Sequence, residues 1–203
     1  MATKHVYFYG AGKAEAKGSD LSKEILGGKG VGLMEMTSIG LPVPAGFTVS
    51  IPTCAEYYEL GRKFPKGLEK EVLDALNKLE KCTGKKLGDA NDPLLVSVRS
   101  GAARSMPGML ETILNLGLND RSVEGLAKKT GNPRFAYDSY RRFIQMFSTT
   151  AMGLSKEHME DMLHAMKHDL GVKNDTEIPA EKLKELCAQF KKFYQDHKGE
   201  PFP

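Results

Sequence analysis

Residues 94–101 read Leu-Leu-Val-Ser-Val-Arg-Ser-Gly, and this stretch marks where the chain changes its structural type. Its first five residues are mostly apolar or β-branched, and Asp92 and Pro93 precede them, which is typical of a short strand after a turn. Residues 5–9 (His-Val-Tyr-Phe-Tyr) and 47–49 (Phe-Thr-Val) have the same strand-like composition. This stretch is the last of the candidate strands. Soon after it, the periodicity of the apolar residues is that of helices alone.

Helical patterns lie between the candidate strands and throughout the second half of the chain. In the first half we predict helices at residues 30–39, 53–61 and 66–82. The second of these would begin at a Thr53-x-x-Glu56 capping box. After Asn119 every periodic segment repeats with a period near 3.6 residues, which indicates helices alone.

Two apolar stripes define helices of the second half. The first follows a capping Ser155 and consists of Met159, Met162, Leu163, Met166 and Leu170. The second lies within residues 180–197 and consists of Leu183, Leu186, Cys187, Phe190, Phe193 and Tyr194. With a further helix over about 133–152, these stripes can bury one another as a small bundle. The sequence therefore predicts an α+β chain, with an α/β subdomain containing a small mixed sheet at residues 1–118 and an all-helical subdomain at residues 119–203.

The composition is that of a folded chain of ordinary polarity. It has 203 residues, 40% of them hydrophobic and 27% charged, with a formal net charge of +3. Charges of both signs are spread over both halves, so binding to nucleic acid or to an anionic membrane through bulk charge is not expected. The three cysteines form no CxxC pair, which favours a reducing compartment. No apolar run approaches the ~18 residues of a membrane span, so we expect a cytoplasmic protein.

A glycine-rich turn surrounds one lysine, because residues 26–32 read Leu-Gly-Gly-Lys-Gly-Val-Gly. The backbone N–H groups of such a turn can approach an anion closely where the turn opens a helix, so phosphate binding beside Lys29 is one interpretation. The other is a tight helix-entry turn that holds no ligand. Gly30 follows the lysine where a P-loop has Ser or Thr, so the pattern is not a Walker motif.

Arg99 stands where the last candidate strand runs out into a loop of small residues. A guanidinium in this position can leave the core and clamp a phosphate with two hydrogen bonds. The loop, residues 102–109, reads Ala-Ala-Arg-Ser-Met-Pro-Gly-Met and has few bulky side chains, as a loop lying against a ligand needs. The alternative is a surface ion pair for Arg99 and a plain connection for the loop.

Three further motifs have simpler interpretations. Gly10-Ala-Gly12 could begin a dinucleotide fingerprint, but Glu15 occupies the third glycine position, so we expect a flexible turn. His164 and His168 share one helix face opposite the apolar stripe, which favours a solvated face over a metal site. Cys187 lies within its apolar stripe and is interpreted as a core residue and not as a catalytic thiol.

Several motifs, taken in order, resemble a known family. They occur at residues 26–30 (Leu-Gly-Gly-Lys-Gly), 40–48 (Gly-Leu-Pro-Val-Pro-Ala-Gly-Phe-Thr), 92–101, 105–109 (Ser-Met-Pro-Gly-Met), 115–120 and 131–146. Together they are similar to the N-terminal nucleotide-binding domain of the pyruvate, phosphate dikinase family, and the likeness covers nearly the whole chain. The resemblance implies an ATP-grasp fold, so residues 1–118 would be an incomplete ATP-grasp-like subdomain.

The resemblance also implies an activity. The domain would bind ATP with Mg²⁺ and phosphorylate a histidine on a separate carrier domain, which delivers the phosphoryl group to pyruvate on a (β/α)₈ barrel. The overall reaction interconverts ATP, phosphate and pyruvate with AMP, pyrophosphate and phosphoenolpyruvate. Carried over by motif position, Lys29 would hold the nucleotide phosphates, and Arg99 would be catalytic and bind the transferring phosphoryl groups. Gly108 would let backbone N–H groups reach the terminal phosphate.

The chain departs from the family pattern in two respects. Gly32 stands where the family commonly has Asn, and Leu110-Glu111 stands where it usually has Met-Asp. The family supplies the acidic Mg²⁺ ligands from a later strand region, so no metal ligand is expected among these residues. We therefore expect an inactive fragment of a larger enzyme that is a homodimer when complete. A phosphoenolpyruvate synthase-type phosphotransferase and a non-catalytic nucleotide-binding or interaction module stay open as alternatives.

Overall fold

The computed structural model describes residues 4–101 and 111–203, and they form two compact units. The first unit comprises the described residues of Met1–Gly84 and Ser100–Leu110, and the second comprises Lys85–Arg99 and Glu111–Pro203. The α+β class is confirmed. The strands of residues 85–99 and 111–118 belong to the same compact unit as the helices, so the predicted subdomain boundary at residue 118 stays a prediction.

The first unit contains a three-stranded antiparallel sheet in the order β2-β1-β3. Its elements are β1 (Val6–Gly10), β2 (Lys13–Ala14), a 3-10 turn (Gly18–Asp20), α1 (Lys23–Ser38), β3 (Gly46–Val49), α2 (Ile51–Glu59) and α3 (Leu68–Thr83). Val6 pairs with Val49 at one end of the central strand, and Gly10 pairs with Lys13 at the other. The strands predicted at 5–9 and 47–49 and the helix predicted at 66–82 are confirmed within one or two residues.

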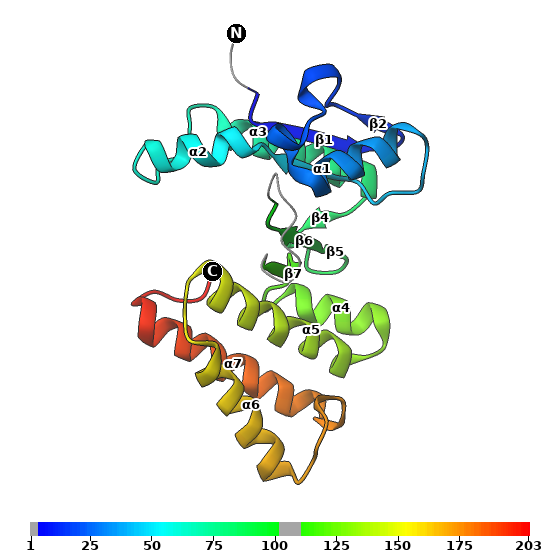
Figure 1. The fold of residues 1–203 in the computed structure, drawn as a ribbon. Coiled ribbons are helices and arrows are strands. Elements are labelled where there is room, and N and C mark those ends of the chain that lie inside the picture. The colour runs from blue at the N-terminus through cyan, green and yellow to red at the C-terminus, as the bar shows by residue number, and fades with distance from the viewer. Residues whose placement is uncertain (1–3, 102–110) are drawn as a thin grey trace. The chain divides into compact units, whose positions relative to one another are not determined.

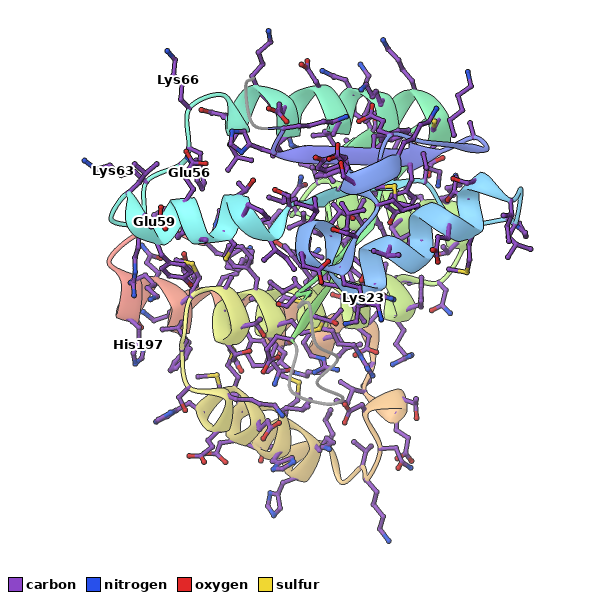
Figure 2. The ribbon with its side chains drawn as sticks, turned by 45° about the horizontal axis from the view of Figure 1, so that its top comes forward. Lys23, Glu56, Glu59, Lys63, Lys66 and His197 are labelled. Atoms are coloured by element: carbon purple, nitrogen blue, oxygen red, sulfur yellow. The ribbon has the colours of Figure 1, made fainter. Side chains whose placement is uncertain are left out.

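Helices α1 and α3 lie on opposite faces of β1, as Figure 2 shows. Successive side chains of a strand point to opposite faces, so β1 contributes to two apolar clusters. Tyr7 and Tyr9 pack with residues of α1, including Leu26 and Met34. Val6 packs instead with residues of α3. Both faces of β1 are thereby buried, which is why the strand is apolar or aromatic from Val6 to Tyr9.

The turn between β1 and β2 decides the interpretation of Gly10-Ala-Gly12. Ala11 and Gly12, the two residues of the turn, have φ angles of 49° and 72°. Positive φ at both positions is the mark of a type I′ hairpin turn. A dinucleotide fingerprint needs a helix after the first strand, whereas β1 is followed by an antiparallel strand. The turn interpretation is therefore confirmed.

The second unit combines two small strand pairs with four helices in its described part. The elements are β4 (Lys86–Leu87), β5 (Pro93–Leu94), β6 (Val96–Arg99), β7 (Thr112–Leu116), α4 (Ser122–Thr130), α5 (Pro133–Met146), a π-helical turn (Phe147–Ala151), α6 (Lys156–Leu170), a 3-10 turn (Asp175–Glu177) and α7 (Ala180–Lys198). Strands β4 and β5 are parallel, and β6 and β7 are antiparallel. Ser155 caps α6 as predicted, since its side chain accepts a hydrogen bond from the His158 N–H.

Helix α5 is central to the second unit, because it packs against α4, α7 and β7 (Figure 1). The predicted stripes at 159–170 and 183–194 contribute to one continuous core. Ile144, Met159, Leu183, Leu186 and Phe190 in this core have no exposed surface. Helices alone were predicted after Asn119, and this is confirmed among the residues from 119 to 203.

Two local predictions are wrong. The run Leu94–Val98 is not one buried strand, because β5 ends at Leu94 and β6 begins at Val96 with a different partner. Val98 is 48% exposed as a result. The capping box at Thr53 does not form either. Ser50 is the N-cap of α2, and the Thr53 hydroxyl is buried inside the helix's first turn, 2.8 Å from Ser50 Oγ.

No helix in the described ranges is long and apolar enough to cross a membrane.

Candidate functional site

The glycine-rich turn forms a break inside α1. Gly27 has φ 69° and ψ 167°, so a short helical piece before it and a longer one from Gly28 onward are joined by a non-helical residue. A positive φ of this kind is available to glycine with little strain. The break begins a new helical piece, and the first N–H groups of any helix have no carbonyl of their own helix to bond. The predicted helix-opening turn is therefore present, with α1 starting earlier than the predicted residue 30.

The other glycines of the turn have two different roles. A Cβ at Gly30 would lie 3.0 Å from Leu26 Cβ and 3.2 Å from Thr48 Cγ2, so this glycine lets α1 pack closely on β3. A Cβ at Gly28 or Gly32 would meet nothing within 4 Å. Gly30 thus fits the tight-turn interpretation, whereas Gly28 and Gly32 leave the backbone of α1 open to a ligand.

Lys29 lies between these glycines with its side chain exposed. Its Nζ donates a hydrogen bond to the carbonyl oxygen of Ser100 at 3.3 Å, and Ser100 belongs to the same compact unit. The lysine forms no ion pair with any residue in the described ranges. A charge-assisted bond to an anionic oxygen is stronger than one to a neutral carbonyl. The Lys29 ammonium is therefore available to an anionic ligand.

Arg99 is the last residue of β6, and its backbone pairs with Thr112 of β7. The side chain is exposed, and its Nε donates to Ser97 Oγ at 3.2 Å. This bond leaves the two terminal nitrogens of the guanidinium for other acceptors. Within the part of the chain that the structure describes, Arg99 has no acidic partner, so the surface ion-pair interpretation finds no support there.

The three predicted site residues are described separately. Lys29 belongs to the first unit and Arg99 to the second, and each is described within its own unit. Gly108 lies outside the described residues. The assignment of these residues to one site remains a prediction.

Two other motifs have the surroundings expected of them. His164 and His168 are exposed, as a solvated helix face requires. Cys187 is buried in the core of the second unit, and burial raises the pKa of its thiol to about 12. A thiol with this pKa is protonated at neutral pH and is a poor nucleophile.

Two contacts of the glycine-rich turn were missed by sequence reasoning. Thr48 packs against Gly30, and the Ser100 carbonyl accepts the Lys29 bond. Lys29 and Ser100 are 71 residues apart in the sequence, so no local pattern could have paired them. The nearest signal is that both belong to stretches rich in small residues.

An exposed lysine beside a glycine break, and an exposed arginine at a strand end, are features of proteins that bind anionic ligands. Comparison with known families places the chain among nucleotide-binding domains. Residues 59–174 match the family described as "Pyruvate phosphate dikinase, AMP/ATP-binding domain". This match spans more than half of the 203 residues, and the chain belongs to that family.

Full-length relatives extend the similarity to the rest of the chain, including Lys29. The chain is 54% identical over 188 residues to pyruvate, phosphate dikinase of Clostridium symbiosum, which covers 92% of this chain and 22% of the relative. It is 54% identical over 202 residues to pyruvate, phosphate dikinase 2 of Zea mays, covering 100% of this chain and 22% of the relative. The Giardia intestinalis enzyme is 50% identical over 204 residues, with 23% of its length covered. The chain thus spans between a fifth and a quarter of the length of these relatives.

Proposed function

We propose that the chain is the N-terminal nucleotide-binding part of a pyruvate, phosphate dikinase and that it binds ATP through Lys29 and Arg99. The observation that carries the proposal is the Lys29 ammonium, which is exposed at the Gly27 break and, among the described residues, is bonded only to a neutral carbonyl oxygen. Beside it, the open backbone at Gly28 and Gly32 lets a phosphate chain approach α1 without a steric clash.

Each residue has a distinct proposed role. Lys29 is a point charge that neutralises the nucleotide phosphates. Arg99 is the catalytic residue, and its planar fork holds oxygens of the transferring phosphoryl group while negative charge on them changes. Gly108 permits a close approach of backbone N–H groups to the terminal phosphate. Together these groups supply positioning and positive charge, which phosphoryl transfer chiefly requires of a protein.

The proposed metal is Mg²⁺, but the candidate residues do not fit it as ligands. Lys29 and Arg99 are cations, whereas Mg²⁺ takes carboxylate, phosphate and water oxygens. The acidic ligands are therefore proposed to belong to another part of the longer protein, and we assign no step through the metal to this chain.

In the longer protein, the phosphoryl group would pass from ATP to a histidine on a separate carrier domain. A (β/α)₈ barrel would then bind pyruvate and receive the group, giving phosphoenolpyruvate. The overall reaction would convert ATP, phosphate and pyruvate to AMP, pyrophosphate and phosphoenolpyruvate, or the reverse. A cytoplasmic homodimer is the proposed form of the complete enzyme, and the 203 residues alone would bind ATP weakly and catalyse nothing.

Isothermal titration of the 203-residue chain with ATP tests the binding role of Lys29. We expect a dissociation constant weaker than about 10 µM, and about a tenfold further loss in Lys29→Gln, the usual effect of removing one charge-assisted bond. Lys66→Gln is the matched control, because Lys66 is exposed in the same unit and projects away from α1 (Figure 2). Equal losses of ATP affinity in the two variants would mean that ATP binding depends only on the net charge of the chain, and this would refute the Lys29 assignment.

Arg99→Lys in the longer enzyme tests the catalytic role. Because lysine cannot reproduce the guanidinium fork, ATP-dependent phosphorylation of the carrier histidine should slow by roughly 10² to 10³-fold, as on loss of one electrostatic donor. Phosphoryl exchange between the carrier histidine and pyruvate should be unchanged, since it would take place on another domain. A wild-type rate of histidine phosphorylation would show that Arg99 is an ordinary surface residue.

A further inference from the structure

The second unit has a hollow of about 640 Å³ that the proposed nucleotide site does not use. The start of α4, helices α5 and α7 and the C-terminal segment surround it. Its lining includes Arg121, Tyr140, Lys191, Lys192 and Phe202. This volume is within the range of pockets that bind small organic molecules.

The one acidic side chain of the lining, Asp120, is already neutralised. Lys191 Nζ lies 2.6 Å and 2.8 Å from its two carboxylate oxygens, and the Tyr140 hydroxyl donates to it at 3.1 Å. The same contact occupies the Lys191 ammonium. Among the side chains of the lining, Arg121 and Lys192 are the cations that Asp120 does not hold.

Arg121 is the freer of these two cations. Its backbone N–H is bonded to Asn119 Oδ1, but its guanidinium bonds to no residue in the described ranges. Lys192 is shared with Asp196 in an i,i+4 pair at 3.2 Å, and its side chain is 75% exposed. A guanidinium whose donors bond to no described residue suits an oxyanion, which it can bind with two parallel hydrogen bonds.

Phe202, another residue of the lining, is held by aromatic contacts. Phe202 meets Phe143, Phe147 and Tyr194 edge-on, with ring centroids 6.0, 5.4 and 5.3 Å away. Such contacts hold the ring in one orientation, and Pro201 and Pro203 flank it at the hollow. A ligand that fits this arrangement has an anionic end for Arg121 and a flat apolar body for the Phe202 side.

We propose that this hollow binds a small organic oxyanion, a carboxylate or a phosphate monoester that carries an aromatic or other flat apolar group. Arg121 binds the oxyanion, Lys192 adds positive charge, and the segment from Pro201 to Pro203 covers the apolar part. The site shares no residue with the proposed ATP site, since neither Lys29 nor Arg99 is in its lining.

Naphthyl phosphate and naphthoate are suitable fluorescent probes, because the chain contains no tryptophan to obscure their emission. Titration of the 203-residue chain should give saturable binding of at least one probe in the millimolar range or tighter. Arg121→Gln should weaken it by about tenfold, since it removes one charge-assisted contact. Lys192→Gln should have a smaller effect, about twofold to threefold, because that charge is exposed and shared with Asp196.

Two further variants separate this site from the ATP site and from bulk charge. Arg62→Gln removes an exposed guanidinium of the first unit and should leave the probe affinity unchanged, as should Lys29→Gln. Naphthol, which lacks the charge, and inorganic phosphate, which lacks the ring, should each bind at least tenfold more weakly than the probe. A preference for naphthyl phosphate or for naphthoate would identify the natural ligand as a phosphate ester or a carboxylate.

Three results would overturn the proposal. The first is the absence of saturable binding. The second is an equal loss of probe affinity in Arg121→Gln and Arg62→Gln, which would reveal unspecific attraction of the probe to a cationic surface. The third is loss of binding in Lys29→Gln with none in Arg121→Gln, which would place the probe in the nucleotide site. Circular dichroism of each variant establishes that the fold is intact, and Arg121 is exposed, so its replacement should not disturb the core.

Discussion

The two units bury their apolar residues in different ways. The second unit holds one core of seventeen buried residues from helices and neighbouring segments, whereas the first holds separate clusters of five and three among its described residues. The sheet causes this difference, because β1 lies between α1 and α3 and its side chains point alternately toward one helix and toward the other. A small sheet covered on both faces divides its core, while helices packed around α5 share one.

The first unit also joins its elements through polar contacts. Glu71 Oε2 accepts the backbone N–H groups of His5 and Val6 at 2.8 and 2.9 Å. The His5 ring lies 3.0 Å from the Thr53 hydroxyl, so it ties the start of β1 to α2. The second unit has a buried ion pair of its own, between Arg141 and Asp138 at 2.7 Å, so the units differ in how their apolar cores are divided and not in having polar contacts.

Phe190→Ala should have the largest effect on stability. Phe190 has no exposed surface in the shared core, so truncation leaves a cavity that many neighbours line. We expect the second unit to lose about 3–5 kcal/mol of unfolding free energy. Hydrogen exchange should show the loss in the second unit alone, with Gln189→Ala on the exposed face of α7 as a control. Equal loss of protection in the first unit would mean that the two units unfold together.

Gly125→Ala should come next. A Cβ at this position of α4 would lie 2.0 Å from the carbonyl oxygen of Ala90 and 2.8 Å from Asn91 Cα, both of them backbone atoms. Because backbone cannot rotate away as a side chain does, we expect a loss of about 2–3 kcal/mol despite the better helix propensity of alanine. Urea unfolding of the variant measures the change. A more stable variant would contradict the close approach of α4 to residues 90 and 91.

Acid should weaken the first unit through Glu15. Burial opposes ionisation of this carboxyl, but hydrogen bonds from Lys78, Lys4 and the Phe8 N–H outweigh it and lower its pKa to about 2. The folded pKa lies below the ordinary value of 4.5, so the stabilisation is complete above about pH 4.5 and is lost as the pH falls toward 2. Solvent screening of the two lysines limits the effect to about 1–2 kcal/mol. Glu15→Gln should remove this part of the acid sensitivity, as pH-dependent urea unfolding would reveal.

Gly32→Ala should have the smallest effect and the opposite sign. This glycine is inside α1, and a Cβ there would meet nothing within 4 Å. Alanine should therefore stabilise the first unit by about 0.5–1 kcal/mol, the usual difference in helix propensity. The same substitution thus stabilises one unit and destabilises the other. A destabilised Gly32→Ala would indicate that α1 is crowded on this face.

Long, strongly periodic segments could be predicted from the sequence, and short ones could not. The stripe from Leu183 to Tyr194 marked α7 because its period extends over three turns. Strand β7 was missed, since Asn115 interrupts its apolar run and has a left-handed φ of 61°. Strand β4 has two residues and carries no periodic signal. Its existence depends on pairing with β5, which is a tertiary contact.

The candidate site was predictable only in part. Composition alone pointed to Lys29, since four glycines around one lysine have few structural explanations. The break at Gly27 and the close packing at Gly30 could not be distinguished from the sequence, because both need a residue without a side chain for different reasons. The guanidinium of Arg121, which bonds to no described residue, gave no local signal either. Whether an arginine finds an acidic partner depends on which acids the fold brings near it.

The path of the chain between the two units constrains how the gene can be divided. The polypeptide leaves the first unit after Gly84, returns at Ser100 and is again in the second unit from Glu111. Neither unit is therefore encoded by one continuous stretch of DNA. A single cut cannot yield either unit whole, and a crossover between residues 99 and 112 would produce chimaeras in which the β6–β7 pair joins strands from two parents.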